Sequence, residues 1–480
     1  MNSESVATPF TRRLQERIAQ SRFFTFSLLL HAIIVVIAGG AVLFQRPPPP
    51  PPDFAPPTGE LVVEEATPHP PIDPLQNLAA SSPAPALPEI APPQLSSAVP
   101  SRNSTPLPDL PIVTFKPGNI DLPVLCTPLP EPSPSARVPH TMASRLGARE
   151  RMAAAKKTGG KESSEKAVAA GLRWLKQNQN ADGSWSDEFR PAMTGLALLS
   201  FFGHGELPDS PEFGPMVKKG LDWVLARGGE FEGRMSLTKG GFGGNHGVYE
   251  HAILTYAMGE YFSMTHDERF EGLLKTAVGY IVAGQNPLGG WDYGYAKGPR
   301  NDLSVAGWQI QALKAAHLTG LAIPGVDEAL DRSMGFIKKW QGNEGGFGYT
   351  QPENRLSLSG VGVLCTYFWR ESKDRTVKEG IDYLLGKAEV KYKSESADLY
   401  AWYYDTQACL MFGGVAWAKW NRMFQDEIAG SQSADGSWPM PQGGGVGNLQ
   451  RKPDGAGPLY RTTLCILMLE VFYRYSPINK

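Results

Sequence analysis

The sequence predicts an all-α fold whose C-terminal domain, residues 161–480, is an (α/α)6 toroid, a closed barrel of six helix-hairpin repeats. Two observations predict it. A motif of Gln, three residues, Gly, one residue and an aromatic residue recurs, and each copy lies between an amphipathic helical run and a more apolar one. Because one such helix pair cannot bury its apolar face alone, six pairs are expected to stack and close into an inner and an outer ring. One transmembrane helix and a disordered Pro-rich linker are expected to precede this domain.

The N-terminal part of the chain has the pattern of a membrane anchor. A basic leader at residues 1–22 contains four arginines, and the 22 residues from Phe23 to Phe44 contain no acid and no strongly basic side chain. An apolar helix of this length spans a bilayer core. The arginines precede the span, so the N-terminus is expected in the cytoplasm and the toroid outside it. We therefore expect a single-pass protein of the inner (cytoplasmic) membrane with a periplasmic toroid. A cleavable signal peptide is the alternative, although its apolar run is usually shorter.

Two polar residues, Ser27 and His31, lie four positions apart and so on one face of the predicted transmembrane helix. An ionisable group at membrane depth is costly, which makes His31 a functional candidate. The SLLLH run, a basic leader before it and prolines after it resemble the N-terminal anchor of TonB-type energy transducers. That resemblance implies that Ser27 and His31 contact a proton-channel complex of the ExbB/ExbD kind, although no TonB-like C-terminal fold follows. The alternative is a simple anchor that tolerates its histidine.

The linker, residues 45–160, has a composition typical of a disordered tether. Of 42 prolines in the chain, 28 lie between Arg46 and His140. The segment has no hydrophobic period, so it cannot bury enough apolar surface to offset the entropy lost on ordering. Its proline runs favour an extended polyproline II conformation. Near its end, a short basic, alanine-rich stretch at residues 142–161 is expected to form a lead-in helix without chemistry.

Charge and cysteine usage exclude two classes of function. The formal net charge is −2 and the basic residues form no stripe, so no nucleic-acid partner is predicted. The four cysteines lie far apart, and no metal site or cofactor is predicted. Cys365, Cys409 and Cys465 are expected as buried core thiols, with a disulfide between neighbouring helices as the alternative in an oxidising compartment.

The repeats determine the toroid. Complete motifs begin at four glutamines and end at four aromatic residues, and Gly240-Gly241-Phe242 is a degenerate copy; the complete ones are Gln179 to Trp185, Gln285 to Trp291, Gln341 to Phe347 and Gln432 to Trp438. Apolar helical runs follow at 194–202, 248–262, 303–318, 356–369, 399–412 and 460–473, the fifth after a motif-free helix at 376–385. We interpret the motif as structural: Gln bonds to helix-end backbone, Gly permits the turn and Trp packs onto the next unit.

The Gln-x-x-x-Gly-x-Trp repeat resembles the QW motif of the squalene-cyclase family of triterpene cyclases, whose repeat superfamily includes the protein prenyltransferase β subunits. The resemblance covers about residues 165–475 and implies the toroid fold. It does not extend to the catalytic groups. The Asp-x-Asp-Asp acid of squalene-hopene cyclases is absent, and of the prenyltransferase zinc positions Asp302 remains, while Ser304 replaces cysteine and Arg461, after Tyr460, replaces histidine.

Candidate chemistry lies where the inner helices begin, around one mouth of the central cavity. Glu250 beside His251, facing Asp302 or Asp405, is a candidate for general acid–base work. The alternative is that these carboxylates cap helices and bond tyrosine hydroxyls. The remaining predicted cavity residues are aromatic or polar and come from four repeats: Tyr249, Asp292, Ser304, Trp308, Tyr403, Tyr404, Tyr460 and Arg461.

Three functions are compatible with these residues. The first is a membrane-anchored, extracytoplasmic toroid that binds an apolar or amphipathic, isoprenoid-like ligand or a protein segment and lacks the family's catalytic groups. The second is an active enzyme of the cyclase or transferase kind that uses Asp302, Asp405 or His251. The third is a glycan-processing toroid that uses Asp302, Asp405 and Glu250. Carboxylates paired in an open cleft favour the glycan enzyme, and carboxylates bonded to helix ends favour binding.

Overall fold

The computed structural model describes residues 140–475, except 238–241, 243–245 and 370–372. The predicted transmembrane helix at 23–44 with Ser27 and His31, the Pro-rich linker up to residue 139, Cys126 and part of the degenerate motif copy lie outside the described residues. None of the helices in the described part combines the length and the apolar character that crossing a membrane requires.

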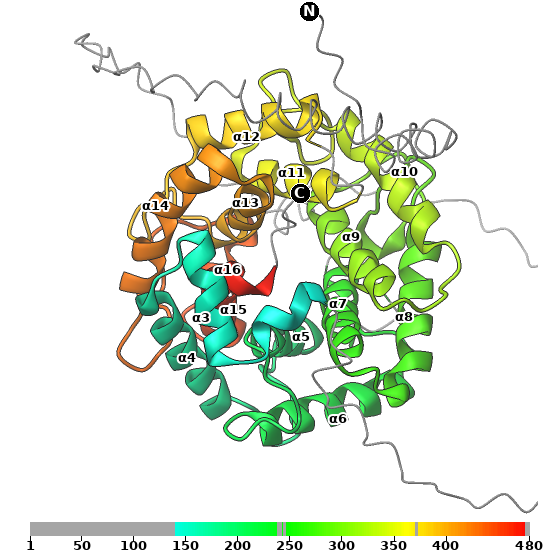
Figure 1. Ribbon diagram of the computed structural model, residues 1–480. Coiled ribbons are helices and arrows are strands. Elements are labelled where there is room, and N and C mark those ends of the chain that lie inside the picture. Colours follow the sequence, from blue (N-terminus) through cyan, green and yellow to red (C-terminus); the bar gives the residue numbers. More distant parts are fainter. Residues whose placement is uncertain (1–139, 238–241, 243–245, 370–372, 476–480) are drawn as a thin grey trace, which may run out of the picture. The chain divides into compact units, whose positions relative to one another are not determined.

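The described residues confirm an all-α toroid of two concentric rings (Figure 1). In the outer ring are α4 (Glu162–Gln177), α6 (Gly214–Glu230), α8 (Glu271–Gly284), α10 (Val326–Lys339), α12 (Arg375–Lys387) and α14 (Gly414–Gly430). In the inner ring are α5 (Arg190–Gly203), α7 (Gly247–Thr265), α9 (Leu303–Leu318), α11 (Leu356–Phe368), α13 (Leu399–Phe412) and α15 (Ala456–Leu469). Each inner helix packs against the next, and α15 packs against α5, so the inner ring is closed.

Burial explains which helix of each pair lies inside. The inner helices are apolar all round and buried on almost every face, as α7 and α9 are. The outer helices bury one stripe and expose charged residues on the other side, as α10 and α12 do. The predicted amphipathic runs are therefore the outer helices, and the predicted apolar runs are the inner helices.

The glutamine of each motif joins two repeats. The Gln179 side-chain amide donates to the Gly183 carbonyl of its own turn at 2.9 Å and to the Met216 carbonyl of α6 at 2.9 Å. The last copy closes the ring, since the Gln432 amide donates to the Ala167 carbonyl of α4, the first outer helix, at 2.8 Å. Both acceptor carbonyls lie in the first two turns of the next outer helix, so the glutamine ties its own turn to that helix near its start.

The motif glycine cannot be replaced without strain. Gly183 has φ +98°, and a Cβ at this position would lie 2.3 Å from the Lys219 carbonyl oxygen of α6. The other three copies have the same geometry. Only glycine combines a positive φ with so close an approach to a backbone carbonyl.

The motif tryptophan is buried completely and binds at both ends. The Trp185 indole N–H donates to the Leu175 carbonyl at the end of α4 at 2.8 Å, and its ring packs against Gly220 of α6. Trp291 and Trp438 repeat this bond at 2.8 and 2.7 Å. The indole thus satisfies a helix-end carbonyl and also fills the gap between neighbouring outer helices.

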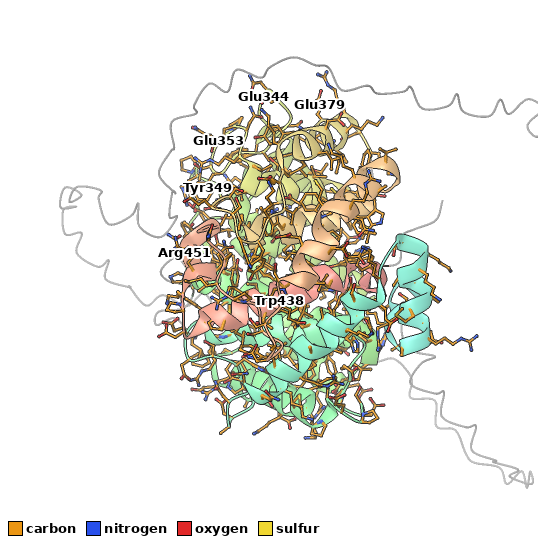
Figure 2. All side chains as sticks on the ribbon, turned by 90° about the vertical axis from the view of Figure 1, so that its left-hand side faces the viewer. Glu344, Tyr349, Glu353, Glu379, Trp438 and Arg451 are labelled. Carbon is orange, nitrogen blue, oxygen red and sulfur yellow. The ribbon has the colours of Figure 1, made fainter. Side chains whose placement is uncertain are left out.

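Two short elements before the first repeat belong to the folded part. The 3₁₀ helix η2 (His140–Arg145) and α3 (Ala148–Thr158) pack against α16 (Val471–Arg474), at the edge of the ring where the inner helices end. Figure 2 views the ring from the side, with Tyr349 and Arg451 at one edge and α3, in cyan, at the other. The tether as predicted to residue 160 is therefore too long, because residues 140–158 include helices that cover this edge.

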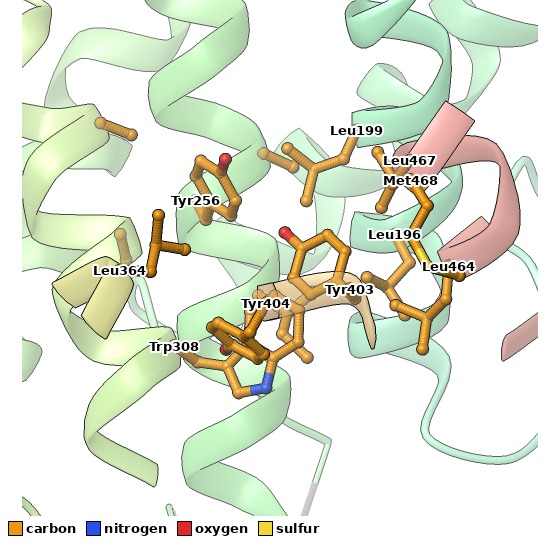
Figure 3. Packing of buried hydrophobic residues seen from close by; sticks show 14 of the residues in the cluster. Leu196, Leu199, Tyr256, Trp308, Leu364, Tyr403, Tyr404, Leu464, Leu467 and Met468 are labelled. Carbon is orange, nitrogen blue, oxygen red and sulfur yellow. The ribbon is translucent and has the colours of Figure 1, made fainter. Parts of the chain in front are cut away.

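The centre of the ring is filled by side chains. Figure 3 shows Trp308, Tyr403, Tyr404, Leu196 and Leu464 converging there from four inner helices. The ring of Tyr403 stacks on Trp308 with centroids 5.6 Å apart, and Tyr404 meets Trp308 edge-on at 5.7 Å. The three described cysteines, Cys365, Cys409 and Cys465, are buried in this core and form no disulfide with one another.

Candidate functional site

A cavity of about 430 Å³ lies at the edge of the ring where the inner helices begin. Its walls come from the first turns of α5, α7, α9, α13 and α15, from η4 (Tyr293–Tyr295) and from η5 (Val446–Arg451). The aromatic wall residues are Phe189, Tyr249, Tyr293, Trp308, Tyr400 and Tyr460. The aliphatic ones are Ala192, Met193, Leu196, Ile253, Val446 and Leu449, and the main polar groups are His246, Glu250, Ser304, Asn448 and Lys452.

Arg300 organises a polar cluster beside this cavity. Its guanidinium pairs with Asp292 and with Asp302, the second at 3.1 Å, and lies over the rings of Tyr293 and Tyr349 at 4.9 and 5.6 Å. The two tyrosine hydroxyls are hydrogen-bonded at 2.6 Å. Burial raises the pKa of Asp292 although Arg300 opposes this. Both predicted aspartates are therefore bound to one arginine and do not face an open cleft as a pair.

Asp302 caps the inner helix α9. Its Oδ1 accepts the backbone N–H groups of Ser304 and Val305 at 2.9 and 3.1 Å and the Ser304 hydroxyl at 2.6 Å. The residue is fully buried and does not line the cavity. Its oxygens therefore satisfy orphan donors at a helix start, which is the structural alternative considered for this residue.

Glu250 is the one predicted carboxylate that lines the cavity. Its Oε2 accepts the Ser236 hydroxyl at 2.8 Å and the Leu237 backbone N–H at 3.2 Å. The side chain thus holds the segment that leads toward α7. Asp302 and Asp405 do not accompany it in the cavity wall, so the carboxylate pair that glycan cleavage uses does not line this cavity.

His251 is engaged through both ring nitrogens. Nδ1 accepts the Met235 backbone N–H at 3.0 Å, and Nε2 lies 2.8 Å from the Ala277 carbonyl of α8, to which it donates. Burial lowers the pKa of His251 to about 4. The imidazole is therefore neutral near pH 7 and links α7 to its neighbours, with no nitrogen available to a ligand.

Asp405 lies deeper than the sequence suggested. It was expected at the mouth. Helix α13 begins at Leu399 as predicted, but Asp405 lies well inside the helix, against Gly360 of α11. Its carboxyl oxygens are buried without a side-chain partner among the described residues. Burial raises its pKa well above the usual range, which favours the neutral carboxyl. The helical phase, which places residue 405 toward α11, removes it from the cavity.

Tyr403 and Tyr404, like Asp405, lie deeper than the predicted cavity mouth. Both are buried in the central packing and neither lines the cavity, whereas their stacking partner Trp308 does. The side chain of Gln311 bridges them: its amide donates to the Tyr404 hydroxyl at 3.0 Å, and the Tyr403 hydroxyl donates to its oxygen at 3.2 Å. These tyrosines form the floor below the cavity.

Tyr460 and Arg461 are neighbours in the sequence but have different roles. Tyr460 lines the cavity. Arg461 is buried and donates to the carbonyls of Trp438, Gln450 and Lys452 at 2.7–3.1 Å. It therefore holds the η5 loop, which forms one cavity wall, and in this position it replaces the metal ligand of the prenyltransferase pattern.

Sequence reasoning missed several wall residues. Phe189, Val446, Leu449 and Lys452 come from loops without a hydrophobic period. Tyr400 lies in the first turn of α13, three residues before the predicted Tyr403. The predicted helix start at residue 399 was right, so choosing the first-turn tyrosine would have found it. Within the described part of the chain, no three histidine, cysteine or acidic side chains come together as metal ligands.

No protein-family model matches the chain. No curated protein matches it either. Among solved structures, an alpha-1,6-mannanase from Salegentibacter sp. HEL1_6 aligns at 10% identity over 65% of this chain and 99% of its own, with a TM-score of 0.48. The type II terpene cyclase MstE from Scytonema, in complex with merosterolic acid A, aligns at 12% identity over 64% of this chain and 96% of its own, with a TM-score of 0.44. A glycosidase in complex with glucose aligns at 13% identity over 64% and 97%, with a TM-score of 0.43. At these values the likenesses carry no functional inference.

Proposed function

We propose that the protein is a binding protein and that its first cavity, at the mouth where the inner helices begin, holds an apolar or amphipathic small molecule of isoprenoid-like character. One observation carries this proposal. The wall is aromatic and aliphatic, while the predicted acid–base groups are used by helix caps, backbone donors or the core. Because these predicted groups are held in other bonds, the wall is suited to burying and orienting a ligand.

The polar groups of the wall suggest how an amphipathic ligand would be oriented. Because the Ser304 hydroxyl donates to Asp302, the Tyr249 hydroxyl donates to Ser304 at 2.7 Å, and the Tyr249 oxygen can still accept a hydrogen bond from a ligand hydroxyl. Lys452 lies on the same wall and pairs with Glu188 at 2.8 Å. The hydrocarbon part would lie against Trp308, Met193 and Ile253. Each 100 Å² of apolar surface buried there is worth about 2.5 kcal/mol before the costs of association.

Native mass spectrometry of the full chain in lipid nanodiscs tests this function. The protein is expected to retain a small apolar molecule, or to take up added farnesol, an isoprenoid alcohol. Met193→Trp places a larger side chain into the cavity and is expected to abolish that uptake. Arg422→Gln, on the exposed face of α14, is the matched control and should bind as the unchanged chain does. Equal farnesol occupancy in a folded Met193→Trp variant, or no uptake by any variant, would refute the proposal.

We also propose that residues 23–44 anchor the chain in the inner membrane, with the toroid in the periplasm and with Ser27 and His31 facing a proton-channel complex. The support is the apolar span, the arginines before it and the Ser-x-x-x-His spacing. His31→Ala is expected to leave membrane fractionation intact and to abolish cross-linking to such a complex. Unchanged cross-linking of His31→Ala would contradict the contact with a proton-channel complex and would support a simple membrane anchor.

A further inference from the structure

A second cavity, of about 470 Å³, lies at the opposite edge of the ring, where the inner helices end. Its walls come from η2, the end of α3, and the ends of α7, α9, α11 and α13, with Arg474 and Tyr475 following α15. Much of the wall is apolar, through Leu318, Phe368, Leu410, Met411, Phe412 and Trp417. Its size lies within the range of small-molecule sites.

Two buried arginines line this second cavity. Arg145 is nearly saturated, since Nη1 pairs with Glu260 at 2.5 Å and its other nitrogens donate to the Arg474 carbonyl at 2.7 and 3.0 Å. Arg474 is fully buried, and its Nη2 donates to the Tyr256 hydroxyl at 3.0 Å and lies 4.0 Å from Glu260. Its Nε and Nη1 have no hydrogen-bond partner in the described part of the chain.

The charges around Arg474 do not balance. Burial opposes ionisation of Glu260, but the two arginines outweigh it and lower its pKa, so Glu260 supplies one negative charge. Glu470 is also near, but burial raises its pKa well above the usual range despite the arginines, which favours its neutral form. The rings of Tyr256 and Tyr475 offer their faces at 5.6 and 5.3 Å, which attracts the cation but accepts no hydrogen bond. An excess positive charge with unused donors therefore remains buried, which is costly.

The cavity's rim adds further positive charge. Lys157, Lys314 and Lys373 all line it, the last with its ammonium over the Phe412 ring at 5.0 Å. Five basic side chains and one acid, Glu260, line this recess, and a low-dielectric recess with an excess of positive charge concentrates anions. The combination of a buried guanidinium, basic rim and apolar wall matches a molecule with one anionic group on a hydrocarbon tail.

We propose that the second cavity is a binding site for an amphipathic anion, with a carboxylate or phosphate group on the Arg474 guanidinium and a hydrocarbon tail along Phe368, Met411 and Trp417. Both unused nitrogens, Nε and Nη1, are buried in the wall and lie on different edges of the guanidinium. A planar carboxylate would therefore reach Arg474 once its side chain turns toward the cavity, where Nη1 and Nη2 together present a bidentate edge. The site is separate from the first cavity, because Tyr403 and Tyr404 fill the ring between them and Gln311, which bonds both, belongs to the wall of the second.

Octanoate is the probe for this site, measured by isothermal titration calorimetry on the full chain in lipid nanodiscs with empty nanodiscs as the blank. The measurement uses the Met193→Trp background, in which the first cavity is filled. We expect saturable octanoate binding and at least tenfold weaker binding of octanol, which has the same tail without the charge. Equal affinity for the two probes, or no saturable octanoate heat, would overturn the proposal.

Three substitutions assign the binding to these residues. Arg474→Gln should weaken octanoate binding at least tenfold, Arg474→Lys should weaken it less, and the exposed control Arg422→Gln should not change it. Circular dichroism identifies the variants that fold. If Arg474→Gln does not fold, Met411→Trp decides, since this half-buried wall residue can be enlarged into the cavity. A folded Arg474→Gln or Met411→Trp variant with unchanged octanoate affinity would overturn the proposal, whereas loss of farnesol uptake concerns only the first cavity.

Discussion

The two mouths of the ring use charge in different ways. Where the inner helices begin, the cation Arg300 is matched by two carboxylates, Asp292 and Asp302. Where they end, Arg145 and Arg474 share Glu260. Helix starts present N–H groups and attract acids, and helix ends present carbonyls and attract bases. The comparison indicates that the carboxylates at the first mouth mainly stabilise the fold. At the second mouth, the Arg474 guanidinium has hydrogen-bond donors that the described part of the fold does not use.

The largest effect is expected from removing the carboxylate that the second mouth shares. Glu260→Ala leaves two arginines buried without it and should lower the free energy of unfolding by about 3–5 kcal/mol. Urea unfolding followed by circular dichroism measures this loss. Glu260→Gln keeps the shape of the side chain, so its free energy of unfolding should lie between those of the unchanged chain and Glu260→Ala. An unchanged midpoint for Glu260→Ala would show that the buried charges are already compensated by other groups.

Breaking the scaffold common to both mouths is expected to be the next largest effect. Gly436→Ala places a Cβ 2.4 Å from the Ala170 carbonyl at φ +92°, in the turn that joins the last repeat to the first. It should cost about 2–3 kcal/mol in unfolding free energy. Gly430→Ala, at the end of α14 with no atom near its Cβ position, is the matched control and should be neutral or slightly stabilising. Equal stability of the two variants would contradict a closed ring.

At the first mouth, Asp302→Ala is expected to cost about 2 kcal/mol, because α9 loses its cap and Arg300 loses one partner. Asp302→Asn keeps an accepting oxygen and should cost less. Thermal unfolding measures both. If Asp302→Ala kept full stability, the carboxylate would not belong to the scaffold and the catalytic reading would regain support.

The smallest effect is expected in the pH dependence of the covering elements. His204 bonds Glu206 and Glu165 at 2.7 and 3.1 Å, and Glu165 also pairs with Arg151 of α3 at 2.8 Å. Burial opposes the charged imidazole, but the two glutamates outweigh it and raise the pKa of His204 above 6.5. This stabilisation is complete below pH 6.5 and is lost as pH rises through the raised folded value.

Glu165 acts in the opposite direction. Burial opposes its ionisation, yet His204 and Arg151 lower its pKa from 4.5 to about 2, so its contribution is complete above pH 4.5 and is lost as pH falls toward 2. Both contributions are therefore full between about pH 4.5 and 6.5. His204→Gln should remove the decline of stability above pH 6.5, as measured by urea unfolding across pH. An unchanged decline would assign it to another group.

The fold was predictable because the alternation of amphipathic and apolar helices recurs in all six repeats and the complete motif in four of them. Gln432, 265 positions from its partner Ala167, performs the same task as Gln179 does locally. The site was predictable where a residue lies near the start of an inner helix, as Tyr249, Ser304 and Tyr460 do. It was not predictable for Asp405, whose position depends on helix phase, or for Arg300 and Tyr349, which come from loops without a period.

The residues before the first repeat show the other limit of the sequence pattern. The basic, alanine-rich stretch was expected only as a lead-in, yet Arg145 and Arg151 are buried and bind groups of α7 and α4. These elements have no hydrophobic period, because they bind the rest of the fold through buried arginines. The sequence pattern therefore predicted a helix in this stretch but not its packing against the folded part.

A crossed titration tests most directly the central claim that one closed ring holds two separate sites of different chemistry. Farnesol and octanoate are titrated by calorimetry into the Met193→Trp and Met411→Trp variants of the full chain in nanodiscs. The account predicts that Met193→Trp loses only farnesol binding and that Met411→Trp loses only octanoate binding. Loss of both ligands in the same folded variant, with both retained in the other, would contradict it.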